Sequence, residues 1–160
     1  MKPGLSHPRR VPFNKGWRDA ALEFTPWLTE QRNLDRLAYT LGINELKLVQ
    51  DEYPAHAFKL GILCFDDVGL FIIVNQLHKT DDRYLGQIIT SAARVGAMRV
   101  IWIAKSFRPE HLATFEFLNR NTTDDLKFFA VEIELWRIAD LPVTRLFNVA
   151  CKPTNWAMVD

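Results

Sequence analysis

Apolar residues recur at helical spacing in the first quarter of the chain. They predict a helix that begins at Thr25-Pro26, with Thr25 as the cap and Pro26 in the first turn, and that ends at Gly42. A shorter helix over residues 17–24 precedes it. The apolar face of the main helix consists of Leu28, Leu34, Leu37, Ala38 and Leu41.

Three segments typical of strands follow, over residues 46–52, 56–65 and 70–75. The sequence Asp-Asp-Val-Gly at 66–69 separates the second from the third as a turn, so these two strands are expected to form a hairpin. The third strand is apolar on both faces, which predicts a central position in its sheet.

The second half of the chain alternates between helices and strands. Gly96 marks the end of one helix and Pro109 the beginning of the next. This order predicts an α/β fold, a mixed central sheet flanked by helices on both faces. The predicted elements are a helix over 81–95, a strand over 100–104, a helix over 109–121, a strand over 128–138 and an edge strand over 145–152.

Composition and charge favour one domain with a basic beginning. The 160 residues are 48% hydrophobic, enough for a sizeable core. Residues 1–18 carry five basic residues and no acid, whereas the remainder carries fifteen against nineteen acids. We therefore expect a basic, irregular arm over residues 1–16 and a single domain over 17–160. The arm either contacts phosphate groups or is a solvated tail.

Two cysteines, Cys64 and Cys151, form neither a disulfide framework nor a zinc-binding pattern. Cys64 lies in an apolar run and is expected to be a buried thiol. The apolar runs are shorter than the roughly 18 residues of a membrane helix, and the first residues lack the apolar segment of a signal peptide. The sequence thus predicts a cytoplasmic protein with no membrane partner.

A series of short motifs runs through residues 20–156. They are Phe-Thr-Pro-Trp-Leu at 24–28, Asn-Gln-Leu at 75–77, Leu-Gly-Gln at 85–87, Ile-Trp-Ile-Ala at 101–104, Phe-Arg-Pro-Glu-His at 107–111, Val-Glu-Ile-Glu at 131–134 and Phe-Asn-Val at 147–149. In this order they resemble a small uncharacterised bacterial family assigned to the restriction-endonuclease-like, PD-(D/E)xK nuclease superfamily. The resemblance implies a core in the order αβββαβ.

The resemblance also implies where a metal-binding site would lie. Nucleases of this fold hydrolyse phosphodiesters with metal-activated water, and Mg²⁺ requires oxygen ligands such as carboxylates. Gly61 stands where the family has an Asp, and Val74 where it has a Glu. Glu23 remains in the place of the helical acid and Gln76 in that of a Lys or Gln, while Tyr84 replaces a His. The resemblance thus implies a degenerate pocket with no intact catalytic site, no metal and no cofactor.

Basic residues provide the candidate contacts to nucleic acid. Lys105 and Arg108 follow the buried strand at 100–104 and are further possible phosphate ligands. A solvated polar face is the alternative interpretation of these cations. His111, at the start of a helix, is interpreted as a surface or capping group. The nucleic-acid-binding candidates are Arg9, Arg10, Lys79, Arg83, Arg94 and Arg99.

Three functions follow from this combination. The leading hypothesis is a catalytically inactive nuclease-fold protein that binds DNA or RNA, or acts as an accessory module, in a bacterial defence or mobile-element system. The second is a protein-interaction or regulatory subunit without nucleic-acid contact, which binds another protein or itself; the edge strand at 145–152 is a place where two copies pair. The third is a Mg²⁺-dependent nuclease whose site is rebuilt by Glu52, Asp66 or Asp67.

Overall fold

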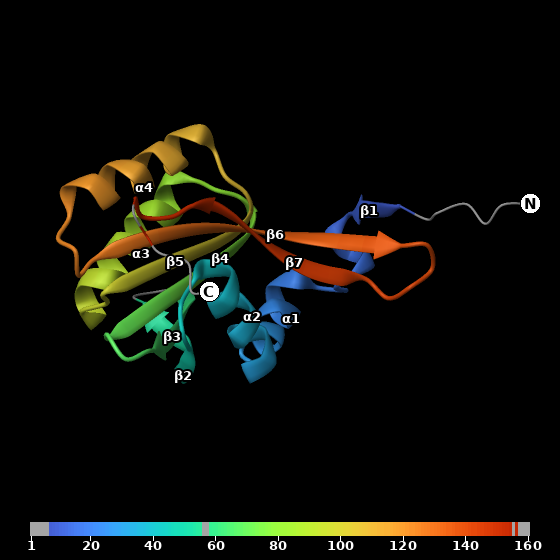
Figure 1. Cartoon of the computed structure of the whole chain (residues 1–160), viewed down its shortest axis with the longest axis horizontal. Coiled ribbons are helices and arrows are strands. Elements are labelled where there is room, and N and C mark those ends of the chain that lie inside the picture. Colours follow the sequence, from blue (N-terminus) through green and yellow to red (C-terminus); the bar gives the residue numbers. More distant parts are fainter. Residues whose placement is uncertain (1–6, 56–57, 155, 157–160) are drawn as a thin grey trace, which may run out of the picture.

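The computed structural model describes residues 7–55, 58–154 and 156. Helices and strands alternate in the second half of the chain, whereas two helices and then three strands follow one another in the first (Figure 1). In chain order the elements are β1 (Pro8–Val11), the 3-10 helix η1 (Phe13–Lys15), α1 (Ala20–Leu28), α2 (Gln31–Leu41), β2 (Lys47–Ala55), β3 (Phe58–Phe65), β4 (Leu70–Lys79), α3 (Asp82–Val95), β5 (Arg99–Ser106), α4 (Pro109–Asn121), β6 (Lys127–Ile138) and β7 (Thr144–Cys151).

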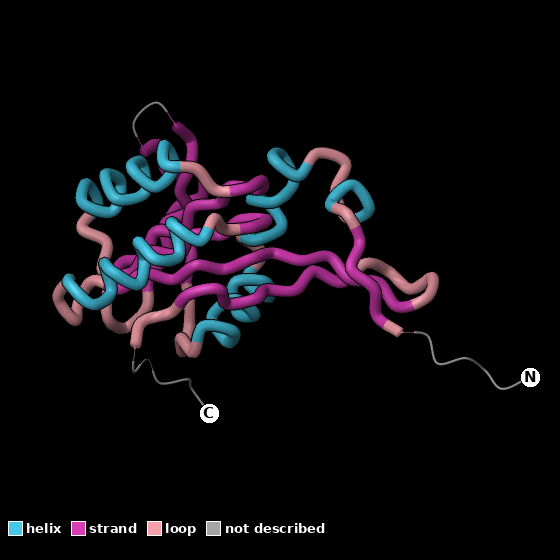
Figure 2. Tube along the Cα trace, turned by 90° about the horizontal axis from the view of Figure 1, so that it is seen from above, coloured by secondary structure: helices cyan, strands magenta, loops and turns pink. Residues whose placement is uncertain are grey.

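The strands form one curled, mixed sheet. β4 pairs in parallel with β5, and β5 in parallel with β6. The pairs β2–β3, β3–β4 and β6–β7 are antiparallel. β6 is long enough for β5 to pair with its first half and β1 with its end, on the same edge, while β7 follows the other edge. The end of β6, with β1 and β7, therefore extends beyond the body of the sheet (Figures 1 and 2).

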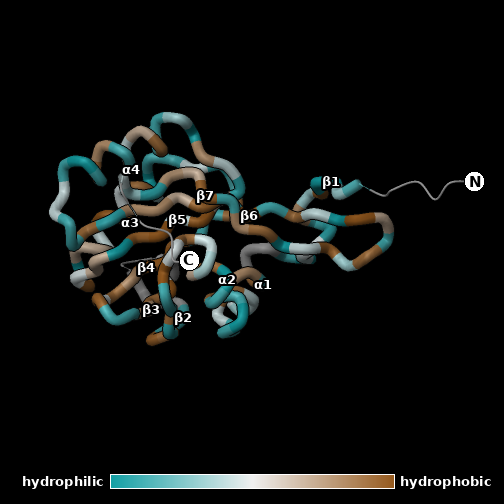
Figure 3. The backbone as a smooth tube through the Cα atoms, in the orientation of Figure 1, coloured by the Kyte–Doolittle hydropathy of each residue, from teal (hydrophilic) through white to brown (hydrophobic). Residues whose placement is uncertain are grey.

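Alternate residues of the central strands pack into two separate hydrophobic cores, one on each face of the sheet. Phe71, Ile73 and Ile101 pack on the face covered by α1 and α2. Ile72 and Trp102 pack on the other face, against α3 and α4. Figure 3 shows the apolar residues concentrated along β4 and β5. The expected mixed α/β sheet with helices on both faces is confirmed, and so are the central position of the third predicted strand and the edge position of β7.

The two main helix ends follow from local sequence. Gly42 and Gly96 both adopt the left-handed conformation, with φ of 68° and 67°, that ends a helix at low cost for glycine. Asp81 caps α3 by accepting a hydrogen bond from the backbone N–H of Tyr84. These stops agree with the sequence-based expectation.

The N-terminal region differs from its expectation in two respects. Residues 8–15 are not irregular, because β1 pairs with β6 and η1 follows it. Helix α1 begins after Asp19, whose carboxylate accepts a hydrogen bond from the N–H of Leu22, so Pro26 lies inside α1. A separate helix, α2, begins after Glu30. The proline was thus a poor guide to the helix start because a capping aspartate lay upstream.

Both cysteines are buried free thiols, Cys64 in the α1–α2 core and Cys151 in the α3–α4 core. Burial raises the pKa of Cys64 to about 12; burial, followed by the nearby Glu116 carboxylate, raises that of Cys151 to about 11. Across the part of the chain that the structure describes, no helix is long and apolar enough to cross a membrane.

The two thiols lead to a prediction about reactivity and pH. Because the thiolate is the reactive species, we expect neither Cys64 nor Cys151 to react with a thiol reagent at pH 8 until urea unfolds the protein. The folded-state pKa of Cys64 lies above the value of about 9 expected for the unfolded chain. Its contribution to the free energy of unfolding is therefore fully present below pH 9 and is lost as pH rises towards 12. Urea unfolding from pH 7.5 to 10.5 should therefore show falling stability, with a shallower fall in Cys64→Ala. Rapid labelling of both native thiols would contradict this.

Candidate functional site

Polar side chains gather where β4 and β5 end and α3 and α4 begin. The two strand ends are joined by the backbone hydrogen bond from Thr80 N–H to Ser106 O, 3.1 Å long. The carboxyl ends of parallel strands are where α/β proteins most often bind ligands. We call this region the strand-end site. It comprises Gln76, Lys79, Thr80, Asp81, Asp82, Lys105, Arg108 and His111.

One pair in the strand-end site links the sheet to α3. The Gln76 amide donates from Nε2 to Oδ2 of Asp81 over 3.0 Å, while Oδ1 of Asp81 caps the helix. Gln76 is only 2% exposed, and its Oε1 has no hydrogen-bond partner among the described residues. The indole Nε1 of Trp102, on the neighbouring strand, is likewise buried without a partner there. A buried acceptor and a buried donor thus lie unsatisfied on the same face of the sheet.

A second group ties α3 to α4 through His111. The Thr80 hydroxyl accepts the backbone N–H of Arg108 (3.0 Å), so its own proton is available to Nδ1 of His111, 2.7 Å away. Nε2 of His111 then donates to Asp82, also at 2.7 Å. The ring is 2% exposed, so the expected surface position of His111 is wrong. Its burial follows from packing on Trp102, with ring centroids 5.5 Å apart.

The order hydroxyl, imidazole, carboxylate is that of a nucleophilic triad, but the geometry does not support that chemistry. Thr80 is 1% exposed, and both roles of its hydroxyl are taken by Arg108 and His111. A nucleophile must reach a substrate atom, which this oxygen does not do. The group fixes the beginnings of two helices instead.

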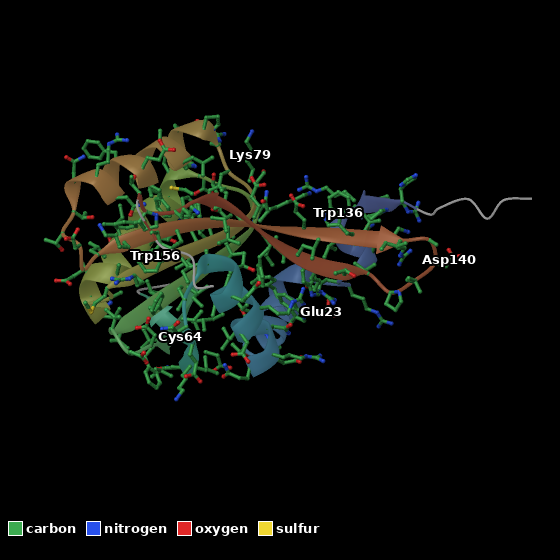
Figure 4. The ribbon with its side chains drawn as sticks, viewed as in Figure 1. Glu23, Cys64, Lys79, Trp136, Asp140 and Trp156 are labelled. Carbon is green, nitrogen blue, oxygen red and sulfur yellow. The ribbon has the colours of Figure 1, made fainter. Side chains whose placement is uncertain are left out.

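The positions implied by the nuclease resemblance are only partly brought together. Gly61 and Val74 lie directly opposite each other on β3 and β4, and Gln76 is two residues further on the same face. Tyr84 packs against the same core from α3, and burial, then the nearby Asp81, raises its pKa. Glu23 does not join this group. It lies exposed on α1, which covers the opposite face of the sheet (Figure 4).

The acids considered as replacements also lie elsewhere. Oδ1 of Asp66 accepts the N–H groups of Val68 (2.7 Å) and Gly69 (3.0 Å) in the β3–β4 turn, beside Asp67. This turn is at the opposite end of β4 from Gln76, roughly 20 Å away for six strand residues. The side chain of Glu52 lies outside the described part of the structure. No three His, Cys, Asp or Glu side chains that the structure describes are grouped closely enough to hold a metal.

The candidate cations separate into exposed and buried groups. Arg9 and Arg10 are exposed on β1 and face opposite sides, since neighbouring strand residues alternate. Lys79 is exposed at the end of β4. Arg83 and Arg94 are exposed at opposite ends of α3.

Arg99 is not available to nucleic acid, contrary to the sequence-based expectation. It is 7% exposed, and its Nη1 donates to the carbonyl oxygens of Met98 (2.9 Å) and Asp125. Its guanidinium lies 5.4 Å from the ring of Trp156, and burial lowers its pKa. Arg99 is the first residue of β5, and its buried side chain connects this strand end to residues 125 and 156. Asp125 and Trp156 are far from Arg99 in the sequence, so no local pattern predicted these contacts.

The N-terminal region adjoins the strand-end site through Lys105. Its Nζ lies 5.3 Å from the ring centroid of Phe13, in η1. Arg10, on the strand just before η1, forms an ion pair with Glu134 of β6 at 3.7 Å. Because β1 occupies the same edge of β6 as β5, the two basic regions predicted separately lie end to end. Sequence analysis missed this contact because it joins residues far apart in the chain.

Comparisons with known proteins find little. No family model matches the chain, and no curated protein matches it. One solved structure that it resembles is that of Pyrococcus furiosus SfsA in complex with Ca²⁺, with a TM-score of 0.42 and 12% sequence identity. The similarity covers 84% of this chain and 64% of the SfsA chain, so this chain spans less than two thirds of that protein's length.

Proposed function

We propose that the protein binds nucleic acid through its phosphates, on a nuclease-like scaffold that lacks a working metal site. In this proposal the run α2–β2–β3–β4–α3–β5 is taken as the core of that scaffold, and the order of its elements along the chain supports this assignment. The phosphate contacts come from a cation strip, defined as Arg10, Lys79, Lys105 and Arg108. Phosphate contacts of this kind give affinity without sequence specificity.

The contact between Lys105 and Phe13 is the observation that carries this proposal. It joins the basic β1–η1 segment to the strand-end site, so cations from three elements follow one another along the molecule. Arg10 is the strand partner of Trp136, so β1 extends the series of basic residues along β6 beyond the end of β5.

Acidic residues near the strip do not prevent phosphate binding. Arg10 pairs with Glu134 at 3.7 Å, and Arg108 pairs with Glu110 at 3.4 Å. Both arginines are half exposed, and such surface ion pairs contribute about 0–1 kcal/mol each. Several phosphates of one ligand compete effectively with pairs this weak, since each contact also releases counterions.

The positions opposite each other on β3 and β4 support binding without cleavage. Hydrolysis in this fold relies on carboxylates that hold a metal, and the chain has Gly61 and Val74 there. Val74 is 1% exposed and packs in the α3–α4 core, so a metal ion would meet an apolar surface. Glu23, the remaining acid of the pattern, lies on the other side of the sheet.

Neutralising the strip should weaken binding and its salt dependence. In the triple variant Lys79→Gln, Lys105→Gln and Arg108→Gln, we expect the slope of log affinity against log salt to fall by up to about 3, since each phosphate contact contributes about 0.9. The measurement is fluorescence anisotropy of labelled duplex DNA, single-stranded DNA and RNA in chelator, over a range of salt. Arg120→Gln, an exposed cation at the other end of α4, is the matched control and should bind as the parent does.

Three results would count against the proposal. The first is no binding of any of these nucleic acids even at low salt, and the second is equal binding by the triple variant and the parent. The third is Mg²⁺-dependent cleavage that disappears in Glu23→Ala, which would favour a rebuilt nuclease site.

A further inference from the structure

A groove runs between helix α2 and the outer edge of β7. Three hollows of about 500, 380 and 290 Å³ follow one another along it. Arg36 lines the first two, and Thr40 lines the second and third, so the hollows adjoin. On the strand side they are lined successively by residues 142–145, 146–147 and 149–152. We call this feature the α2–β7 groove; both elements lie near the crossing of β6 and β7 in Figure 1.

The wall formed by β7 presents backbone groups without strand partners. Nη2 of Arg36 donates to the carbonyl oxygen of Arg145 over 2.5 Å, which shows that this carbonyl points away from β6 and into the groove. In an antiparallel strand, alternate residues point their N–H and C=O groups to the same side. Phe147 and Val149 therefore also face the groove. No hydrogen bond within the described residues uses their outward groups.

The groove combines an apolar floor with a basic rim. Phe147 and Val149 pack partly against the α1–α2 core, and Tyr39 on α2 is 80% exposed. Among the charged residues that line the three hollows, the acid is Asp35. The cations are Arg32, Arg36, Arg145 and Lys152.

The charge of the groove distinguishes between the partners that can pair with an open strand edge. Of the lining cations, Arg32 is paired with Glu30 at 2.9 Å, and Arg145 donates to Gly16 O and lies over the ring of Trp17. This leaves Arg36 and Lys152 as the main attractions for an incoming acid. A second copy paired through β7 would bring the same basic rim against this one, and like charges oppose that contact. An extended acidic segment meets one like charge among the lining residues, Asp35, against four cations.

We propose that the α2–β7 groove binds an extended, acidic peptide segment of a partner protein, which adds to the sheet as a strand beside β7. Its backbone pairs with Phe147 and Val149, and its carboxylates face Arg36 and Lys152. Strand addition of this kind draws affinity from main-chain hydrogen bonds and specificity from alternate side chains. The groove is separate from the cation strip, so this inference does not depend on the proposed nucleic-acid binding.

The probe is a fluorescein-labelled octapeptide of four Glu-Val repeats, whose alternation prevents a slip by one residue. We expect saturable binding, and binding at least about tenfold weaker for the matching Lys-Val peptide. N-methylation of one alternate set of peptide amides should weaken binding by about tenfold or more, because it removes the bonds to β7, while the other set has a smaller effect. Backbone NMR should show the largest shifts at Phe147 and Val149.

Two protein variants make the test independent of the peptide chemistry. Val149→Pro removes an outward N–H, a change tolerated at a strand edge, and should weaken binding by about tenfold. Arg36→Gln should weaken it by about threefold or more, whereas Arg120→Gln on α4 should not. Circular dichroism and the urea midpoint check that each variant is folded. If Val149→Pro does not fold, the N-methylated peptides still decide the question.

Several outcomes would overturn the inference. One is the absence of saturable binding at millimolar peptide. Another is equal binding by both N-methylated peptides and the parent peptide, which would indicate side-chain attraction without strand pairing. A third is a concentration-dependent dimer that Val149→Pro disrupts, which would assign the groove to a second copy. Competition by DNA that is lost in Arg36→Gln would assign it to nucleic acid.

Discussion

Replacing Trp102 with alanine is expected to lower the free energy of unfolding by about 3–5 kcal/mol, a large part of the roughly 5–15 kcal/mol that stabilises a domain. The indole is fully buried on β5, and its ring centroid lies 5.3–5.6 Å from those of Phe107, His111 and Phe115. Alanine leaves a cavity that these rings cannot all collapse to fill. Urea unfolding followed by circular dichroism measures the change.

Trp102→Phe separates the packing of the indole from its unpaired N–H. Phenylalanine keeps most of the aromatic contact and removes a buried donor that has no partner among the described residues. Since an unsatisfied buried group costs about 1–3 kcal/mol, its removal offsets part of the lost volume. We expect Trp102→Phe to cost less than half of what Trp102→Ala costs. Equal losses in the two variants would show that the N–H is satisfied in solution.

Replacing Asn119 with alanine should lower the free energy of unfolding by about 2–6 kcal/mol. The buried amide of Asn119, near the end of α4, donates to Phe128 O (2.9 Å) and accepts from Phe128 N–H (2.8 Å). This one side chain therefore satisfies both backbone groups of the second residue of β6. Its loss leaves a buried donor and a buried acceptor unpaired, each at a cost of about 1–3 kcal/mol.

Asn121→Ala provides a matched control for this prediction. Asn121 is two residues further along the same helix, and its amide donates to Phe117 O in an exposed position. Water replaces that bond, so the change should stay within about 0.5 kcal/mol. Urea unfolding of the two variants under one set of conditions tests the difference. A loss no larger in Asn119→Ala than in Asn121→Ala would show that the bonds to Phe128 do not determine the effect, because alanine raises helix propensity at both positions.

Elements with local signals were predictable from sequence. Helix α3 lies between a capping aspartate, Asp81, and a left-handed glycine, Gly96, and both signals act within a few residues. The central strands β4 and β5 were evident from apolar runs, because both of their faces are buried. The last strand was recognised as an edge strand, and β7 indeed pairs with β6 alone among its described neighbours.

Features that depend on distant partners were not predictable in this way. Arg99 has the sequence neighbourhood of a surface cation, and contacts with residues 125 and 156 bury it. His111 follows an exposed glutamate, yet the ring packs on Trp102. The family pattern grouped Glu23 with Gln76. In the structure α1 and α3 cover opposite faces of the sheet, and this separates the two residues. Local periodicity contains no information about which face a helix covers.

The strand pairing of β1 has a consequence for the order of events during synthesis. Val11 pairs with Leu135, more than a hundred positions later in the chain. At a translation rate of about 5–20 residues per second, the ribosome needs on the order of ten seconds to make the partner strand after β1 has been made. The nascent chain therefore carries Arg9 and Arg10 on a segment without its strand partner while the body of the sheet is still being produced. These two arginines acquire their fixed positions only after β6 has left the ribosome.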